Sequence, residues 1–445
     1  MPNTIAQNLA RLQAAKTAIG AAITAKGGTV ASGDGLEEFA TDIGTIPSGG
    51  GGGGTTPNAV NFYDYDGTIV NSYSAADFAQ LSAMPSNPTH AGLTAQGWNW
   101  SLADAKAYVT KYGRLNVGQT YITSDGKTRI YIKLSDGRIS PVLELYLNAN
   151  TEVDVDWGDG STHTTWTSTS AGFQSERHAY ASAGDYVIAI TVVSGSIQLK
   201  SSSTSFGTLL TNGNNNKYSS DMAYLNSIQK IEIGSGITSI GNDAFNSSYS
   251  FTSITIPDSV TSIEDYAFKN CYSLISVTIP NSIRNIGNYA FYYCTTLTSV
   301  AMPNSIRNLI GPYAFYYCNL LKSITISGSV SDIGNYAFYY CDALKSITIP
   351  GSVRRIMPFA FNGCSALTSI TIPDNVAYIY GYAFYGCYSL GFIKFESTTP
   401  PTVDNASAWS NIPTDCIIYV PEGSLSAYTS ASNYPSSSTY NYVEY

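Results

Sequence analysis

Apolar residues in the first 48 positions recur with the period of an amphipathic helix. They are separated by steps of three, four and seven, and Lys16 stands where one more apolar residue would complete the seam. This spacing is typical of a short coiled coil. The glycine pair at 27–28 predicts the end of this helix, and Asp34 with Glu37 predicts the start of a second one. The seam consists of Ile5, Leu9, Leu12, Ile19 and Ile23.

We therefore expect residues 1–48 to form a helical hairpin that serves as an anchor. Two arrangements stay open at this point. The hairpin closes on itself in a monomer, or it self-associates through the seam, in which case a trimer is favoured. The linker at 49–56 contains six consecutive glycines. A glycine run behaves as a flexible coil, so we expect a hinge before the next domain.

Residues 57–125 are predicted to form a small α+β module. Ser74 followed by Asp77, and Ser101 followed by Asp104, both show the Ser-x-x-acid pattern that begins helices. Short apolar stretches around these two helices predict strands.

Residues 126–200 are β-rich and are predicted to form a β-sandwich. Thr128–Leu134 alternates apolar and polar side chains, and Ser-Asp-Gly at 135–137 predicts a turn back. The stretches VDVDWGDGS (153–161) and HAYASAGDYVIAIT (178–191) resemble the sandwich modules of the polycystic-kidney-disease (PKD) type. That resemblance implies a spacer or adhesion module and no catalytic role.

From residue 222 to residue 396 the pattern repeats about every 23 residues. An Ala-Phe pair recurs with gaps of 23, 23, 24, 23, 23 and 23, and the single 24 comes from an extra residue in IRNLIGPYAF. A fixed period in this range is typical of a solenoid in which each coil contacts only its neighbours. The alanines of the pair are Ala244, Ala267, Ala290, Ala314, Ala337, Ala360 and Ala383.

Each unit offers the same inward-facing residues. One β-branched strand position and the Ala, Phe, Cys and Leu of the turn are expected to fill the core. The strand positions are Ile254, Val277, Val300, Ile324, Ile347 and Ile370. Six cysteines share one repeat phase, and we expect small buried thiols rather than disulfides, because their side chains run parallel. They are Cys271, Cys294, Cys318, Cys341, Cys364 and Cys387.

The unit VTIPNSIRNIGNYAFYYCTTL resembles the BspA-like (Treponema-type) leucine-rich repeat. Residues 397–445, with CIIYVP at 416–421, resemble the closing cap of such arrays. A solenoid needs a cap of this kind for solubility. The expected fold is therefore multidomain and mainly β: a helical hairpin, an α+β module, a β-sandwich and a leucine-rich-repeat solenoid.

Tyrosine is abundant, with 35 residues in 445, and it recurs around the Ala-Phe pair. Amphipathic rings of this kind stack on sugar faces while their hydroxyls form hydrogen bonds, and they are common in antibody-combining surfaces. We treat them as candidate ligand-binding residues; the alternative is that they only cover the solenoid or an oligomer interface. The candidates are Tyr289, Tyr292, Tyr293, Tyr313, Tyr316, Tyr317, Tyr336, Tyr339, Tyr340, Tyr382 and Tyr385.

Arg284 and Arg307 share one repeat phase and are also candidate binding residues. Neighbouring strands lie about 4.8 Å apart, so two such cations could hold an anionic ligand. A solvated edge is the favoured interpretation.

Composition excludes several function classes. Charged residues make up 12% of the chain and the net charge is −9, which argues against a nucleic-acid partner. No run of 18 apolar residues predicts a membrane-spanning helix. The three histidines lack the spacing of a zinc site, and neither a nucleophile elbow nor a phosphate-binding loop is present. We predict no metal, no cofactor and no catalytic residue.

The stretch FYDYDGTIV (62–70) is the strongest argument for an enzyme, since it resembles the start of haloacid-dehalogenase-type phosphatases. In that family the residue matching Asp64 attacks phosphorus. Such a site needs a Ser/Thr motif, a distant Lys and a second acidic pair on a doubly wound domain. The strand before it contains Asn61 and is too short to predict a buried parallel strand. We therefore interpret Asp66-Gly67 as a hairpin turn.

The stretch NLARLQAAKTAIGAAITAKGGTV, followed by LEEFATDIGTIP, resembles the N-terminal pieces of phage tail and fibre proteins. That resemblance implies attachment to other virion proteins through residues 1–48. The N-terminus lacks the pattern of a secretory signal, so we expect synthesis in a reducing cytosol. The predicted function is a non-enzymatic virion receptor-binding protein, presenting its repeats to a bacterial surface glycan or protein. The alternative is a bacterial cell-surface adhesin, for which we expect a secretion signal or an anchor.

Overall fold

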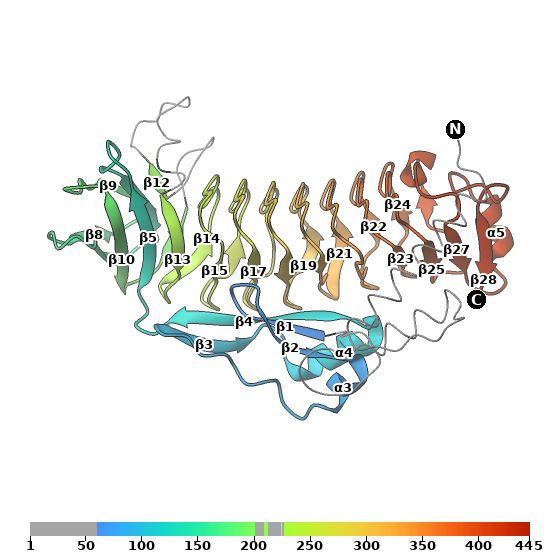
Figure 1. Ribbon diagram of the computed structural model, residues 1–445, viewed down its shortest axis with the longest axis horizontal. Coiled ribbons are helices and arrows are strands. Elements are labelled where there is room, and N and C mark those ends of the chain that lie inside the picture. Colours follow the sequence, from blue (N-terminus) through green and yellow to red (C-terminus); the bar gives the residue numbers. More distant parts are fainter. Residues whose placement is uncertain (1–59, 201–208, 212–223, 225–226) are drawn as a thin grey trace, which may run out of the picture.

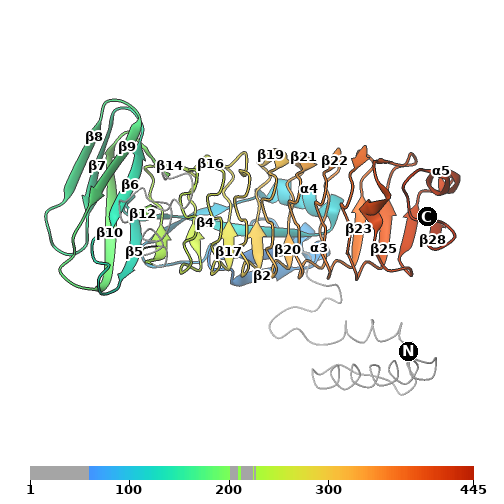
Figure 2. The same ribbon diagram turned by 90° about the horizontal axis from the view of Figure 1, so that it is seen from above.

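The computed structural model describes residues 60–200, 209–211, 224 and 227–445. This part of the chain is mainly β, with a long solenoid and three α-helices. The coils follow one another along the long axis, and residues 60–123 lie along one side of the row (Figures 1 and 2). The predicted hairpin and its seam lie outside the described residues. No described helix is long and apolar enough to cross a membrane.

The α+β module consists of a four-stranded sheet, in the order β2-β1-β4-β3, with two helices packed against it. Both predicted helix starts are confirmed. The hydroxyls of Ser74 and Ser101 accept hydrogen bonds of 3.1 Å from the backbone N–H groups of Asp77 and Asp104. The elements are β1 (Val60–Tyr63), β2 (Ile69–Tyr73), α3 (Ala75–Gln80), β3 (Leu93–Trp98), α4 (Leu102–Tyr112) and β4 (Leu115–Thr123).

Strand β1 overturns the expectation that a short strand with Asn61 would not be buried in a parallel pair. It pairs in parallel with β4 and antiparallel with β2. Val60 and Phe62 are fully buried, whereas Asn61 lines a cavity shared with Ser323 and Thr325 of the solenoid. Apolar and polar residues alternate along β1 because one face of the strand packs on the helices and the other packs on polar residues of the solenoid strands. A continuous apolar run is therefore not required.

Residues 128–199 form strands that divide between two sheets, and both sheets continue into the solenoid. Strand β5 pairs with β13, and β11 pairs with β14, so the hydrophobic core runs on without a break. The strands are β5 (Thr128–Leu134), β6 (Val142–Leu147), β7 (Thr151–Asp156), β8 (Thr164–Ser168), β9 (Gly172–Arg177), β10 (Gly184–Ser194), β11 (Ile197–Leu199), β12 (Leu210–Thr211), β13 (Ile228–Glu232) and β14 (Ile237–Ile240).

The motifs behind the PKD-type resemblance come together within this region. The Trp157 and His178 rings stack with centroids 4.6 Å apart. His178 Nε2 lies 2.7 Å from Asp159 Oδ2, and the Tyr180 hydroxyl donates to the Trp157 carbonyl at 3.0 Å. The resemblance itself stays a prediction.

Each solenoid coil contributes two short parallel strands and an Ala-Phe turn. We call the two rows of strands the first and second strand sides. The first side continues from β13 through β15 (Ile254–Thr255), β17 (Ser276–Thr278), β18 (Ser299–Ala301), β20 (Ser323–Ile324), β23 (Ser369–Ile372), β25 (Phe392–Phe395), β27 (Ile417–Val420) and β28 (Asn441–Glu444). The second side continues from β14 through β16 (Ser262–Ile263), β19 (Arg307–Ile310), β21 (Ser329–Ile333), β22 (Arg355–Ile356), β24 (Tyr378–Ile379) and β26 (Thr402–Val403). The last coils carry η2 (Ala406–Trp409) and α5 (Leu425–Ser430).

The predicted inward positions are buried in every coil. The phenylalanines of the Ala-Phe pairs stack from Phe245 to Phe384, with neighbouring centroids 5.1–5.5 Å apart, and Trp409 ends the column. The cysteines are free and buried, as predicted. Each of the six repeat thiols donates to a phenylalanine carbonyl of the preceding coil, as Cys294 does to Phe268 at 3.1 Å. Burial raises the pKa of Cys341 and Cys364 well above the ordinary thiol value.

The single 24-residue repeat produces a β-bulge. Its extra residue lies in β19, where the register with β21 shifts between Asn308 and Leu309. Because a bulge absorbs one residue locally, Ile310 still meets Ile286 on one side and Ile333 on the other. The core column is therefore continuous through the irregular coil.

The α+β module packs on the first strand side. This differs from the expected row of separate domains, because the module lies beside the repeats and not ahead of them (Figure 1). Strand residues beneath it are polar yet buried, among them Ser276 and Thr278. Among the interdomain hydrogen bonds are those from Asn99 Nδ2 to the carbonyls of Ile279 and Ala301 (both 3.0 Å), Trp100 Nε1 to Met302 O (2.8 Å), Tyr108 Oη to Ile326 O (2.8 Å) and Asn116 N to Thr325 Oγ1 (2.9 Å).

The tightest point of this interface is Gly118 in β4. A Cβ there would lie 2.5 Å from the Thr278 side chain and 2.7 Å from the Ala301 Cβ. We expect Gly118→Ala to lower the free energy of unfolding by about 1–3 kcal/mol, as overpacking does, and to expose the module to limited proteolysis. Urea denaturation measures the first effect. Gly172→Ala, where a Cβ meets nothing within 4 Å, is the control, and equal stability of the two variants would contradict the interpretation.

Candidate functional site

The Ala-Phe turns hold the tyrosines through backbone hydrogen bonds between coils. The N–H groups of Tyr289, Phe291 and Tyr293 donate to carbonyl oxygens of the next coil at 2.8–3.0 Å, and the same bonds recur in the following turns. Tyr289 and Tyr293 adopt positive φ angles of 57° and 60°, a region that few non-glycine residues occupy. The left-handed backbone conformation of these two residues shapes the turn. The three ring positions of the turn are therefore equivalent from one coil to the next.

Because the turns are superimposable, equivalent rings stack in three columns. Centroids of neighbouring rings lie 4.5–5.0 Å apart and ring planes differ by at most 18°. The first column is Tyr266, Tyr289, Tyr313, Tyr336, Phe359 and Tyr382; the second is Tyr292, Tyr316 and Tyr339; the third is Tyr293, Tyr317 and Tyr340.

Neighbouring columns also contact each other. Tyr292 and Tyr293 are tilted by 58° with centroids 4.8 Å apart, and Tyr316 and Tyr317 repeat this contact at 4.9 Å. Three successive coils therefore carry nine tyrosines in mutual contact. We call this set the tyrosine grid: Tyr289, Tyr292, Tyr293, Tyr313, Tyr316, Tyr317, Tyr336, Tyr339 and Tyr340.

The stacking changes how the grid could contact a ligand. The sequence predicted that ring faces would stack on sugars, but the two faces of Tyr316 are covered by Tyr292 and Tyr339, each 4.8 Å away. The same applies within the other columns. Ring edges and hydroxyls are what such a surface can present, and Tyr340, at the end of the third column, is 38% exposed.

The remaining candidates lie outside the grid. Tyr385 contacts Tyr382 with centroids 5.6 Å apart, but Asn362 and Gly363 stand in place of tyrosines in the coil between them and the grid. Arg284 and Arg307 are exposed on the second strand side, in adjacent coils. The oligomerisation residues of the N-terminal seam are not described.

Three contributors escaped prediction. Tyr266 begins the first column, with its ring stacked on Tyr289 at a centroid distance of 4.9 Å. Phe359 belongs to the first column, where it lies between Tyr336 and Tyr382. The available sequence signal was its position directly before an Ala-Phe pair, which it shares with the tyrosines of that column. Lys269 bounds one end, with its Nζ 5.1 Å from the Tyr266 ring centroid and 5.7 Å from that of Tyr292. No ionisable side chain other than tyrosine lies within the grid itself.

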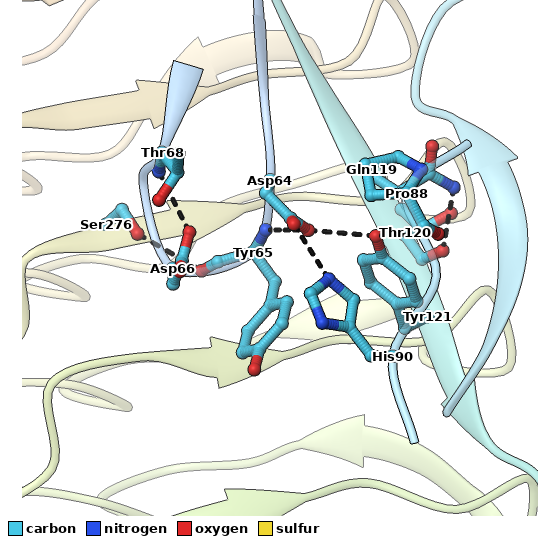
Figure 3. Close-up of polar contacts among 10 residues, drawn as sticks. All are labelled: Asp64, Tyr65, Asp66, Thr68, Pro88, His90, Gln119, Thr120, Tyr121 and Ser276. Atoms are coloured by element: carbon cyan, nitrogen blue, oxygen red, sulfur yellow. Dashed lines mark hydrogen bonds and ion pairs between the residues drawn. The ribbon is translucent and has the colours of Figure 1, made fainter. Parts of the chain in front are cut away.

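The DYDGT stretch forms a second polar cluster, shown in Figure 3. Asp64 is 5% exposed. Its Oδ1 accepts from the Tyr65 N–H and the Tyr121 hydroxyl, both at 2.8 Å, and its Oδ2 lies 2.7 Å from His90 Nε2. Burial, followed by the bond to Asp64, raises the pKa of Tyr121. Both carboxylate oxygens are thus engaged: Oδ1 joins the hairpin to β4 through Tyr121, and Oδ2 joins it to the loop that carries His90.

The predicted hairpin turn at Asp66-Gly67 is confirmed. It joins β1 to β2; Asp66 Oδ1 accepts from the Thr68 N–H at 2.9 Å, and Gly67 has a φ of 86°. Ser276 of the solenoid donates to the Tyr65 carbonyl at 3.1 Å. The turn is therefore part of the interdomain interface. No group of three His, Cys, Asp or Glu side chains in the described ranges could hold a metal ion.

Comparison with protein families identifies the repeats. The family described as "BspA type Leucine rich repeat region" matches residues 218–309 and 307–412 in six copies. The repeat region is therefore of the BspA type, as predicted. The match includes neither residues 1–48 nor residues 126–200, so the tail-fibre and PKD-type resemblances stay predictions. No curated protein matches the chain.

Three solved structures show similarity to parts of the chain. A leucine-rich repeat protein of T. pallidum is 29% identical, with 36% of this chain and 67% of that one covered and a TM-score of 0.29. One from Bacteroides ovatus is 27% identical, with 42% and 55% covered and a TM-score of 0.32. A leucine-rich cell surface protein of Faecalibacterium prausnitzii is 27% identical, with 44% and 61% covered and a TM-score of 0.29.

The grid predicts sensitivity to alkaline pH. Burial and then the neighbouring phenols raise the pKa of Tyr292, Tyr316 and Tyr339. A group with a raised pKa holds its proton more tightly in the folded state, so its stabilising contribution is complete below the ordinary tyrosine value of about 10 and is lost above it. We expect the urea concentration at the unfolding midpoint to decrease as the pH is raised from 10 to 11. Tyr316→Phe keeps the ring but not the ionisable group, and its midpoint should fall less; an identical fall would contradict the assignment.

Proposed function

We propose that this protein is a non-enzymatic recognition protein whose tyrosine grid binds a ligand on a cell surface. The observation that carries the proposal is the mutual packing of nine tyrosines over three successive coils. A single partly exposed tyrosine needs no functional explanation. Nine of them, held rigidly and partly exposed in one array, form a surface that loses little entropy on binding.

The chemistry of the grid supports a neutral, hydroxylated or amide-rich ligand. Phenol hydroxyls both donate and accept hydrogen bonds and are neutral below pH about 10. A surface glycan and an extended protein segment both offer matching groups. Since the ring faces are used within the columns, the ligand would run over the ring edges, in contact with hydroxyls that repeat at the coil spacing.

Of the two settings predicted from the sequence, the bacterial cell-surface adhesin is the better supported. The family match falls on the BspA-type repeats, which are the basis of the adhesin alternative. The virion setting depends on residues 1–48, which lie outside the described part of the chain. It is kept as the second candidate because of the resemblance of that segment to phage fibre proteins.

The absence of an enzymatic role is part of the proposal. Its support is that Asp64, the candidate nucleophile, is 5% exposed and already accepts hydrogen bonds on both oxygens. The proposal likewise includes no cofactor, metal or nucleic-acid partner. A net charge of −9 is unfavourable for binding phosphates.

The binding surface is tested by removing the middle column. We expect the triple variant Tyr292→Ala, Tyr316→Ala and Tyr339→Ala to bind bacterial cells or an arrayed glycan at least about tenfold more weakly, as loss of a cluster of aromatic anchors does. Flow cytometry with labelled protein and a glycan array provide the measurement. Thermal melts establish that the variant is folded.

Two further variants make this test specific. Tyr388→Ala removes a tyrosine that is 62% exposed and outside the grid, and it should bind normally. Replacing the three middle residues by Phe keeps the stack and removes the hydroxyls. Unchanged binding by both triple variants would exclude the grid as the binding surface.

Self-association through residues 1–48 is tested by light scattering of the full chain and of residues 57–445. A trimer that becomes a monomer after removal of the segment would support an oligomerising anchor, since several copies raise avidity without new contacts. A trimer that persists would place the interface elsewhere, with the tyrosine grid as the first candidate. A monomer in both measurements would exclude the coiled-coil interpretation.

A further inference from the structure

A second concave surface lies where the α+β module ends on the solenoid, far in the fold from the ring columns. The C-terminal end of α4 meets the coils around Gly351, and a groove of about 390 Å³ opens there. Small-molecule sites occupy about 300–1,000 Å³ and favour domain interfaces. Six polar residues among its lining carry the argument below: Lys111, Tyr112, Thr348, Thr371, Asp374 and Glu396.

The groove exists because the module covers only part of the first strand side. Tyr112 forms the last contact of α4 with the coils, its phenol oxygen accepting a hydrogen bond of 3.0 Å from the Gly351 N–H. Among the described residues, no helix covers β23 and β25 beyond this point (Figure 1). The groove is therefore bounded by α4 on one side and by the next coils on the other.

Its walls carry polar groups that keep donors or charges for a ligand. Since the Tyr112 oxygen accepts from Gly351, its own proton remains free to donate to a ligand. In the part of the chain that the structure describes, Asp374 and Glu396 form no ion pair. Lys111 contacts the face of the Tyr112 ring at 5.1 Å.

The charge balance selects the ligand. One ammonium and two carboxylates line the groove, so the complementary ligand carries a positive charge. Hydroxyls of Tyr112, Thr348 and Thr371 suit a ligand that is also hydroxylated. Ile347 and Ile349 also line the groove but are buried in the solenoid core, so its accessible contacts are mainly polar. These features together describe an amino sugar with a free ammonium group.

We propose that this groove, defined by Lys111, Tyr112, Thr348, Thr371, Asp374 and Glu396, binds an amino sugar of one or two rings. The ammonium group lies between the carboxylates of Asp374 and Glu396, and the sugar hydroxyls contact Tyr112, Thr348 and Thr371. Lys111 excludes a second cation and donates to ring or hydroxyl oxygens. The site is separate from the tyrosine grid and does not depend on its proposed function.

The test uses the full chain and isothermal titration calorimetry at pH 6 and low salt. The probe is the β-1,4-linked disaccharide of glucosamine, and its N-acetylated counterpart keeps the hydroxyls but lacks the charge. We expect the acetylated sugar to bind at least about tenfold more weakly, as the loss of charge-assisted hydrogen bonds predicts. Equal affinity for the two sugars, or no binding of the free amino sugar, would overturn the proposal.

Variants locate the site. Asp374→Asn and Glu396→Gln keep the shapes of the side chains and remove one charge each; each should weaken binding about five- to tenfold, and the double variant more. Asp415→Asn removes an exposed carboxylate outside the groove and should bind normally. Binding that survives the double variant would place the sugar elsewhere. The triple alanine variant of the grid should bind the disaccharide normally, so failure of the two proposals can be told apart.

Discussion

The structure depends on one repeated interaction, the backbone hydrogen bond that joins each turn to the next coil. In the Ala-Phe turns three N–H groups per coil donate to carbonyls of the neighbouring coil at 2.8–3.0 Å in the grid turns. These bonds hold the coils at the spacing of parallel strands, about 4.8 Å. Every side chain at an equivalent position then lies on top of its counterpart. Phenylalanines stack inside, thiols point to the carbonyls of the coil before, and tyrosines stack outside.

The same spacing both creates and limits the candidate binding surface. Rings held 4.6–5.0 Å apart within the grid support one another without any ligand. The faces of the inner rings are consequently unavailable, and a ligand there has to contact ring edges and hydroxyls. Rigidity is the compensating advantage, because side chains that are already ordered lose little freedom when a ligand binds.

The α+β module converts a polar strand side into an interface. Ser276, Thr278 and Thr325 are unremarkable outward-facing residues of a β-solenoid until Asn99, Trp100, Asn116 and Gly118 approach them. Buried polar groups are tolerated there because the module supplies hydrogen-bond partners. Where the module ends, the strand side becomes accessible again and a groove with unpaired charges remains. One repeat thus provides two different candidate surfaces.

The sequence by itself determined what depends on local period and short-range geometry. The 23-residue repeat, the inward positions, the free thiols and the caps at Ser74 and Ser101 follow from residues close together in the chain. Tertiary structure alone decided where the module packs, since Asn99 and Ala301 are 202 residues apart and carry no shared pattern. It also decided that β1 is a buried parallel strand and that the ring faces are covered. Those outcomes depend on which surfaces meet in the folded protein. The sequence contains no periodic pattern that predicts which surfaces these are.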